Sequence, residues 1–187
     1  MNPNKIVGAR NNRSKYDFYP TPSDVTEGLL QVLNGWFVCD IIKTVWEPAA
    51  GTGSITKVLE EHGLKVIDTD IQSGHNFLTD DAPAEYDMII TNPPFSLADQ
   101  FIRKAYSYGK PFAFLLKCQF FHAKKRYKLF EECRPSMIFP LTWRPDFTGG
   151  GSSLMDMMWV VWLGETKYTF YRPIGRKEIS KNDAQRR

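Results

Sequence analysis

The chain has 187 residues, enough for a single domain with a sizeable hydrophobic core and too few for two. Its hydrophobic content of 42% is ordinary for a globular protein, no apolar stretch approaches a membrane span, and residues 1–5 lack a signal-peptide core, so we expect a cytoplasmic protein. The formal net charge of +3, from 24 basic and 21 acidic residues, is too small to identify a polyanionic partner.

Neither the cysteines nor the histidines form a metal-binding pattern. The three cysteines, Cys39, Cys118 and Cys133, are widely spaced and odd in number, so we expect reduced thiols rather than a disulfide framework. The three histidines are not placed at ligand spacing either. The sequence therefore predicts no metal site.

Strands and helices alternate along the chain, which predicts an α/β fold with a mostly parallel sheet. After a polar arm at residues 1–15, Thr21-Pro22-Ser23 begins a helix whose apolar residues share one face. The first half is completed by strands at residues 44–47, 65–69 and 86–91 and by a helix at residues 54–61. The interval from Asp70 to Asp87 is short, so an additional strand there must be brief and accompanied by turns.

The second half continues the alternation and ends in a basic tail. We expect a helix at residues 96–108 with Ser96 as its cap, a buried strand at 111–116, a basic helix at 123–133, strands at 136–140 and 156–163, and a tail at 173–187. Basic residues also lie near the start of the chain, at Arg10, Arg13 and Lys15. Each basic cluster suits either a nucleic-acid contact or a solvated surface.

The segment Asn92-Pro93-Pro94-Phe95 directly follows the apolar run at residues 88–91. The two prolines fix φ near about −65° and lack backbone donors, so neighbouring carbonyls stay free to accept hydrogen bonds. If the Asn92 side-chain oxygen and the Pro93 carbonyl accept the protons of an exocyclic amino group, the nitrogen lone pair becomes a usable nucleophile. Phe95 would then stack on the substrate ring. The same residues also suit an ordinary turn that closes a strand.

A second segment supplies the context. An apolar strand runs into Glu47-Pro48-Ala49-Ala50-Gly51-Thr52-Gly53, a small-residue turn that allows a nucleotide-like ligand to approach the backbone. The next predicted strand ends in Asp70, about twenty residues after the glycines, where an acid can accept hydrogen bonds from ribose hydroxyls. A glycine pair alone would equally suit a tight turn, but the acid at this distance favours the ligand-binding interpretation.

Together these segments resemble the class I S-adenosylmethionine-dependent methyltransferases, and within them the enzymes that methylate the amino group of adenine in DNA. The resemblance covers roughly residues 16 to 163. It implies a Rossmann-like fold in which a mostly parallel seven-stranded sheet has helices on both faces and an antiparallel edge hairpin. It also implies S-adenosylmethionine as cofactor and nucleic acid, most of all double-stranded DNA, as partner.

The resemblance assigns cofactor contacts residue by residue. The segment Tyr19-Pro20-Thr21-Pro22 looks like the family's further cofactor motif, and Asn76-Phe77 stands where an Asp-Phe pair often contacts the cofactor adenine. A turn asparagine beside a core phenylalanine explains Asn76 and Phe77 equally well. The implied cofactor residues are Tyr19, Thr21, Pro22, Glu47, Pro48, Ala49, Gly51, Gly53, Asp70, Asn76, Phe77 and Asn92.

The resemblance also locates the chemistry and the substrate. It assigns catalysis to Asn92, Pro93, Pro94 and Phe95, with the target adenine flipped out of the helix. Family members place further base contacts in the connection at residues 141–155. The implied substrate residues are Phe95, Lys124, Lys125, Arg126, Trp143, Arg144 and Phe147. For the connection, a surface loop with chance aromatics is the alternative.

Target choice stays open at this point. Sequence-specific relatives usually carry a separate recognition domain, whereas here the last predicted strand ends at Leu163 and only a short tail follows. We therefore expect one domain, residues 1–187, in which recognition is either loose or made by the basic helix, the Gly-rich loop and the two termini. RNA amino-methyltransferases and a protein-glutamine methyltransferase use similar loops, and a catalytically silent binding module is a further alternative.

Overall fold

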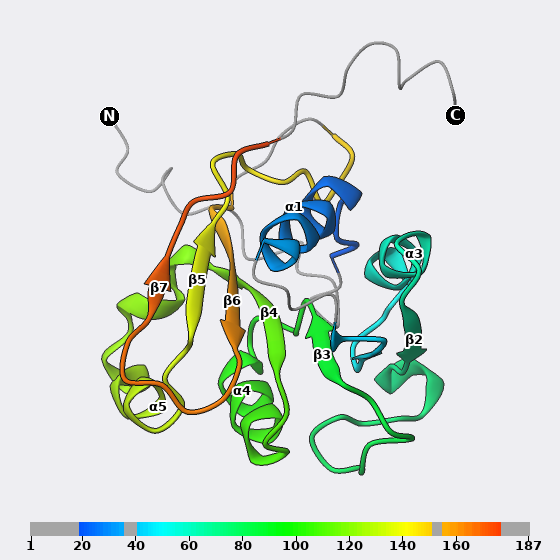
Figure 1. The fold of residues 1–187 in the computed structure, drawn as a ribbon, viewed down its shortest axis with the longest axis horizontal. Helices are drawn as coiled ribbons and strands as arrows, with labels where there is room; N and C mark the ends of the chain where they lie inside the picture. The colour runs from blue at the N-terminus through cyan, green and yellow to red at the C-terminus, as the bar shows by residue number, and fades with distance from the viewer. Residues whose placement is uncertain (1–18, 36–40, 151–154, 177–187) are drawn as a thin grey trace, which may run out of the picture.

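The structure is a computed structural model that describes residues 19–35, 41–150 and 155–176. A central sheet carries helices on both faces (Figure 1). Across the described ranges, no helix combines the length and the apolar character needed to cross a bilayer. The arm at residues 1–15, Cys39, residues 151–154 of the connection and residues 177–187 of the tail lie outside the described residues.

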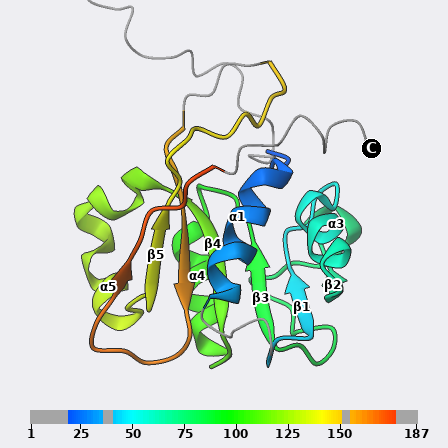
Figure 2. The same cartoon turned by 45° about the horizontal axis from the view of Figure 1, so that its top comes forward.

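Seven strands form the sheet in the order β2-β1-β3-β4-β6-β5-β7. Their bounds are β1 Thr44–Glu47, β2 Lys65–Asp68, β3 Met88–Thr91, β4 Phe112–Lys117, β5 Met137–Pro140, β6 Met157–Trp162 and β7 Phe170–Tyr171. Strands β1 to β4 pair in parallel, whereas β6 runs antiparallel to both β4 and β5, as the arrows in Figure 2 show. The predicted fold class, a mostly parallel sheet with an antiparallel hairpin, is confirmed.

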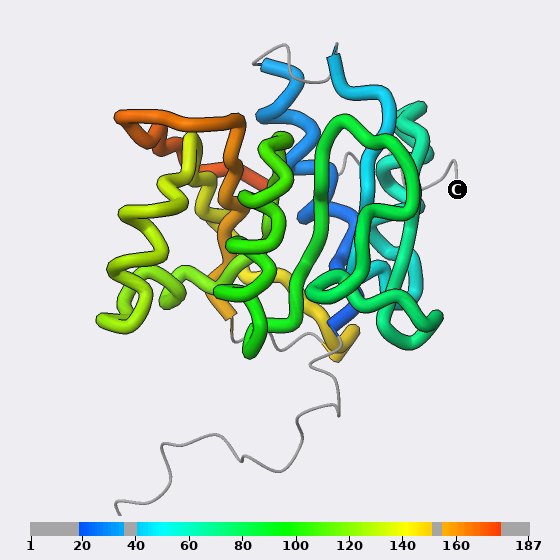
Figure 3. The backbone as a smooth tube through the Cα atoms, turned by 90° about the horizontal axis from the view of Figure 1, so that it is seen from below, coloured from blue at the N-terminus to red at the C-terminus, as the bar shows by residue number. Residues whose placement is uncertain are grey.

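Two details of the sheet differ from the prediction. Residues 69–87 contain no strand; after the short 3-10 helix η2 (Ile71–Ser73) this segment runs as an irregular loop (Figure 3). Its backbone N–H groups form local hydrogen bonds instead of a ladder: those of Thr79 and Asp80 donate to the Asn76 carbonyl, and that of Asn76 donates to Asp80 Oδ2 at 2.8 Å. Strand β7 lies outside the hairpin, parallel to β5, and forms the edge of the sheet.

One face of the sheet is covered by α1 (Ser23–Asn34) and α3 (Ser54–Glu61). The predicted apolar face of α1 is buried, and Gly28 on it lies so close to Ile174 that a Cβ there would come within 3.1 Å of the isoleucine methyl group. The indole Nε1 of Trp159 in β6 donates to the Val25 carbonyl at 2.9 Å. This hydrogen bond links helix α1 to strand β6, which lies near the other end of the chain.

The other face is covered by α4 (Ala98–Ser107) and α5 (Tyr127–Glu132). Ser96 is not the cap of α4; the N-cap is Leu97, because the Leu97 N–H donates to the Pro94 carbonyl at 2.9 Å and a turn precedes the helix. The predicted basic helix is split into η4 (Lys124–Arg126) and α5, after the 3-10 segment η3 (Cys118–His122). Cys118 and Cys133 are free thiols.

Asp87 holds the start of β1 in place. Its Oδ2 accepts from the backbone N–H groups of Thr44 at 2.8 Å and Lys43 at 2.9 Å, and these bonds lower the pKa of Asp87 below its ordinary value. A carboxyl group whose pKa is depressed on folding stabilises the fold above its unfolded-state pKa, and this contribution is lost as the pH falls through the folded-state pKa.

We therefore expect Asp87→Ala to lower the free energy of unfolding at pH 7 by about 1 kcal/mol, a modest value because the carboxylate is exposed to solvent. The difference from the unmodified protein should shrink below about pH 4, as measured by urea unfolding. Asp81→Ala, at an exposed aspartate of the preceding loop, is the matched control and should change little. A difference that stayed constant down to pH 3 would contradict the assigned bonds.

Candidate active site

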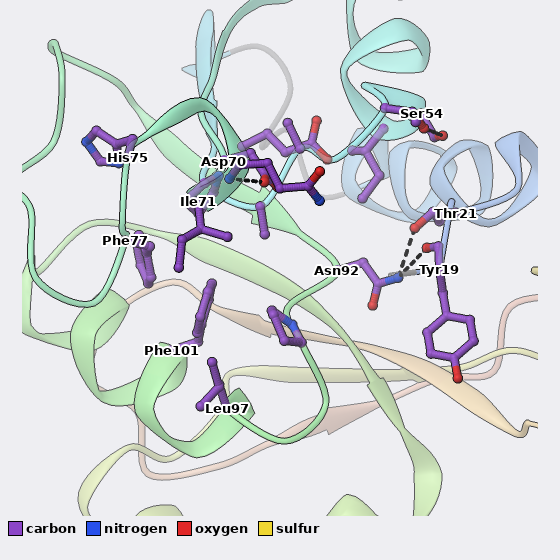
Figure 4. Close-up of a pocket in the computed structure, with 18 of the residues that line it drawn as sticks. Tyr19, Thr21, Ser54, Asp70, Ile71, His75, Phe77, Asn92, Leu97 and Phe101 are labelled. Atoms are coloured by element: carbon purple, nitrogen blue, oxygen red, sulfur yellow. Dashed lines mark hydrogen bonds between the residues drawn. The ribbon is translucent and has the colours of Figure 1, made fainter. Parts of the chain in front are cut away.

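A cavity of about 560 Å³ opens at the carboxyl ends of β1, β2 and β3 (Figure 4). This volume lies within the usual range for small-molecule sites, about 300 to 1,000 Å³. It receives side chains from the segment before α1, the turn between β1 and α3, the loop after β2 and the end of β3. The predicted site residues in its lining are Tyr19, Thr21, Glu47, Pro48, Ala49, Asp70, Asn76, Phe77, Asn92 and Pro94.

Asn92 lies directly after β3 and has a fixed orientation. Its Nδ2 donates to the Thr21 hydroxyl at 3.1 Å and to the Tyr19 carbonyl at 3.3 Å, so the amide nitrogen is engaged (Figure 4). Its Oδ1 is buried and has no hydrogen-bond partner among the described residues. A buried acceptor of this kind is unfavourable unless a ligand donates to it. Asn92 therefore presents an oriented acceptor at a cavity-lining position.

The glycine loop and Asp70 are joined by direct hydrogen bonds. Gly51 and Gly53 have φ values of 56° and 74°, in the left-handed region that favours glycine. The Asp70 carboxylate accepts from the Gly51 N–H at 3.0 Å and from the Gln72 N–H at 2.8 Å. Neither glycine lines the cavity itself; they shape the turn whose residues Thr52 and Ser54 do.

Glu47 is the buried acid of the site, with 1% of its surface exposed. Burial raises its pKa to about 8, in spite of a hydrogen bond that its carboxyl group accepts from the Thr56 hydroxyl. The carboxyl group is therefore mainly protonated at pH 7. A cationic ligand group in the cavity would favour its ionised form.

Asn76 and Phe77 line the cavity, and both also make contacts that stabilise the surrounding fold. The Asn76 Oδ1 accepts from the Leu78 N–H at 3.1 Å, and Phe77 is 2% exposed with its ring centroid 4.7 Å from that of Phe101. The amide oxygen of Asn76 is thus used within a turn, as in the alternative stated above.

His75 was missed by the sequence analysis. Its Nε2 lies 3.0 Å from the Asp81 carbonyl, so Nε2 carries the proton, while the buried Nδ1 lacks a hydrogen-bond partner among the described residues. Apolar lining residues were missed as well, namely Ile71, Leu97 and Phe101. Their residue types are common in cores, and nothing in the spacing singles them out.

Aromatic residues gather beside the Asn92 loop. The Tyr19 ring stacks on that of Phe95 with centroids 5.7 Å apart, and its edge contacts Phe147 at 6.0 Å. The Nζ of Lys117 lies 4.1 Å from the centroid of the Phe95 ring. Tyr19 thus contacts both Phe95 and Phe147, the two rings that were predicted to bind the substrate base.

The other predicted substrate residues are more scattered. Trp143 packs against Gly28 of α1, and Arg144 pairs with Asp156 at 2.7 Å. Arg126 pairs with Asp99 at 2.8 Å and stacks over Phe120. Lys124 and Lys125 are exposed.

Pro22, predicted as a cofactor residue, is the N-cap of α1, and Pro93, predicted as a catalytic residue, is buried; neither is among the residues that line the cavity. Within the described ranges, no group of three or more histidine, cysteine, aspartate or glutamate residues could hold a metal ion.

Comparisons with known proteins support the fold assignment. No protein-family model and no curated protein sequence matches the chain. A class I S-adenosylmethionine-dependent methyltransferase from Listeria monocytogenes is similar in structure with a TM-score of 0.60 and 12% identity, over 95% of this chain and 71% of that one. A protein assigned as an RNA methyltransferase from Pyrococcus horikoshii has a TM-score of 0.58 and 15% identity, over 86% of this chain and 94% of that one. A glycopeptide N-methyltransferase with S-adenosylmethionine bound has a TM-score of 0.50 and 10% identity, over 84% of this chain and 100% of that one. The chain therefore has the fold of class I S-adenosylmethionine-dependent methyltransferases.

Proposed function

We propose that the protein transfers a methyl group from S-adenosylmethionine to the exocyclic amino group of adenine in DNA. The observation that carries this proposal is the buried Oδ1 of Asn92 beside the cavity, for which the described part of the chain supplies no hydrogen-bond donor. An amino group needs acceptors, and the amide orientation at Asn92 leaves only its acceptor available. The loop Asn92-Pro93-Pro94-Phe95 is also the part of the sequence that most resembles adenine methyltransferases.

The cavity fits S-adenosylmethionine in size and in the chemistry of its lining. Asp70 presents carboxylate oxygens suited to ribose hydroxyls, and Glu47 lies where a cationic amino-acid group would be favourable. The apolar side chains of Ile71, Leu97 and Phe101 offer surfaces for the adenine ring. When bound, the cofactor supplies a sulfonium-activated methyl group.

The residues of the chain align the substrate for this chemistry. Asn92 Oδ1 and the Pro93 carbonyl would each accept a proton of the target amino group, which keeps its nitrogen lone pair available. Phe95 would hold the ring by stacking, as expected for a base that has left the helix. Orientation rather than a strong base is the contribution required of the protein.

Contacts to the DNA backbone are proposed for Lys124 and Lys125, which are exposed. Arg126 is a weaker candidate because its guanidinium is engaged with Asp99 and Phe120. If contacts to the backbone dominate recognition, methylation should occur in many sequence contexts, with an affinity that falls steeply as salt rises.

The test is transfer of a labelled methyl group to duplex DNA, single-stranded DNA, RNA and protein in parallel, followed by identification of the product nucleoside or amino acid. N6-methyladenine in DNA is the expected product. Label found only in RNA or in protein glutamine would overturn the DNA assignment, and cofactor binding without any transfer would favour a silent module.

Glu47 makes cofactor binding dependent on pH. Because burial raises the pKa of Glu47 to about 8, a ligand that favours the carboxylate must release protons when it binds near pH 7. We expect the affinity for S-adenosylmethionine to rise between about pH 6.5 and about pH 8.5, by less than tenfold per pH unit, and Glu47→Gln to abolish this rise. Calorimetry in two buffers of different ionisation enthalpy measures the protons released.

A stability measurement provides the control. A folded-state pKa above the ordinary value of 4.5 means that the folded protein holds the proton longer, so Glu47 lowers stability progressively as the pH rises from 4.5 to about 8. Glu47→Gln should therefore gain stability relative to the unmodified protein across this range. Equal proton release by both proteins would show that another group titrates.

A further inference from the structure

Tyr19 makes ring contacts with both residues that were predicted to bind the substrate base. Its ring stacks on that of Phe95, with centroids 5.7 Å apart and planes at 26°, and lies against Phe147 in an edge-to-face arrangement at 6.0 Å. Phe147 is buried, and Tyr19 is half-buried. The three rings thus form one aromatic cluster beside the Asn92 loop.

The ring and the backbone of Tyr19 act at different places. Figure 4 shows the ring pointing away from Asp70, to which the proposed function assigns the cofactor ribose. The backbone carbonyl of Tyr19 accepts a hydrogen bond from Asn92 Nδ2 at 3.3 Å. Tyr19 therefore orients Asn92 through its carbonyl and contacts Phe95 through its ring, and a side-chain substitution changes only the second of these.

The Phe95 ring is already covered by groups of the protein. It packs against the hydrophobic core, and the Nζ of Lys117 lies 4.1 Å from its centroid in addition to the Tyr19 ring. Two rings that sandwich a base are about 6.8 Å apart, twice the rise of about 3.4 Å between stacked bases. The observed 5.7 Å leaves no room for a base between Tyr19 and Phe95, so one of the two rings must move before a base can stack.

We propose that Tyr19 is a positioning residue of this reaction, whose ring occupies the place of the target base and is displaced when that base stacks on Phe95. The inference rests on the proposed function. Rotation about the Cα–Cβ bond of Tyr19 moves the ring and leaves the carbonyl in place, so Asn92 keeps its orientation while the base enters. Before the base enters, the ring covers apolar surface of Phe95 and Phe147 that would otherwise face water.

Displacement makes entry of the base less favourable by the value of the lost ring contact. The stabilisation from one aromatic pair corresponds to about a two- to tenfold change in an equilibrium constant. A protein without the Tyr19 ring should therefore accept the base more readily. Removal of a residue that holds the base would have the opposite effect, so the direction of the change tests the inference.

The experiment removes the ring and keeps the backbone. Tyr19→Ala removes the whole ring, Tyr19→Leu keeps apolar bulk against the core, and Tyr19→Phe keeps the ring; thermal unfolding shows which variants are folded. Tyr168→Ala is the matched control, because Tyr168 is an 85% exposed tyrosine of the segment before β7. Each protein is assayed with saturating S-adenosylmethionine on a G·C duplex that contains a single A·T pair. Fluorescence anisotropy measures binding to the same duplex with an abasic site in place of the adenine.

We expect Tyr19→Ala and Tyr19→Leu to raise kcat/KM about two- to tenfold, and Tyr19→Phe to cancel this gain because it restores the ring. Tyr168→Ala should have the kcat/KM of the unmodified protein. The affinity for the abasic duplex should not differ among the Tyr19 variants, because that duplex has no base to compete with the ring.

The inference would be overturned if neither Tyr19→Ala nor Tyr19→Leu methylated the adenine faster than the unmodified protein. A loss of kcat/KM would show that the ring holds the base, an equal gain by Tyr19→Phe would assign the effect to the hydroxyl group, and an equal gain in affinity for the abasic duplex would show a general effect on DNA binding. Failure of the proposed function is distinguishable, because the unmodified protein would then methylate no adenine in the duplex, which is seen before any variant is made.

Discussion

Replacing Asn92 with alanine is expected to slow methyl transfer by about a hundredfold or more while leaving the affinity for S-adenosylmethionine within a few-fold. The reason is that Oδ1 of Asn92 is a buried acceptor at the cavity with no hydrogen-bond partner among the described residues, whereas the proposed cofactor residues lie mainly on the loops after β1 and β2. Single-turnover kinetics with saturating cofactor measures the effect on chemistry, and calorimetry measures cofactor binding.

Thr21→Val is the control for a second effect of Asn92→Ala, the loss of the hydrogen bonds that the Asn92 side chain donates. Alanine at position 92 also removes the donor that bonds Thr21 and the Tyr19 carbonyl. Valine at position 21 removes the hydroxyl acceptor but keeps the Asn92 oxygen, so its loss of rate should be much smaller. Near-normal turnover by Asn92→Ala, or equal losses in the two variants, would refute the role of the acceptor.

Replacing Asp70 with alanine is expected to weaken cofactor binding by about 10- to 100-fold, and this is the second large effect. Two backbone N–H groups, those of Gly51 and Gln72, donate to the Asp70 carboxylate and would lose their partner. Hydrogen bonds to charged groups contribute about 1.5 to 3 kcal/mol each, and the proposed ribose contacts would be lost with them.

Asp68→Ala is the matched control, because Asp68 is an exposed aspartate at the end of β2, shortly before Asp70, and does not line the cavity. It should bind S-adenosylmethionine nearly as tightly as the unmodified protein. Titration calorimetry compares the two variants directly. An Asp70→Ala protein with full cofactor affinity would show that the acid only shapes the loop or that the ligand lies elsewhere.

Much of the fold could be predicted because burial and turn residues agree along the chain. Strand β1 and helix α3 have the predicted bounds, since an apolar run, two glycines and an amphipathic segment follow one another without ambiguity. The loop at residues 69–87 was harder to predict, because backbone N–H groups donate to the side-chain oxygens of Asn76 and Asp80, and these bonds compete with strand formation. Strand β7 has only two residues, too few for a periodic pattern.

The candidate site could be predicted where its residues belong to a motif at the end of a predicted strand. Glu47 ends β1, and Asp70 and Asn92 come shortly after β2 and β3, so parallel strands that end at the same edge bring the three residues together. The surroundings of Arg126 and Lys117 depend on tertiary neighbours instead. Asp99 engages the first, and the ring of Phe95 lies under the second; neither contact has a signature in the local sequence.

The hydrogen bond from Trp159 to the Val25 carbonyl has a consequence for the order of folding during synthesis. These residues are 134 positions apart, and Val25 belongs to the helix that follows the cavity residues Tyr19 and Thr21. Long-range contacts of this kind form late, because the intervening chain must first be made and brought together. Tyr19 and Thr21 are synthesised early. The part of the cavity that they line would nevertheless be among the last to reach its final position, after β6 has left the ribosomal exit tunnel. A nascent chain that lacks β6 would carry the Asn92 loop without the fixed wall against which it is oriented.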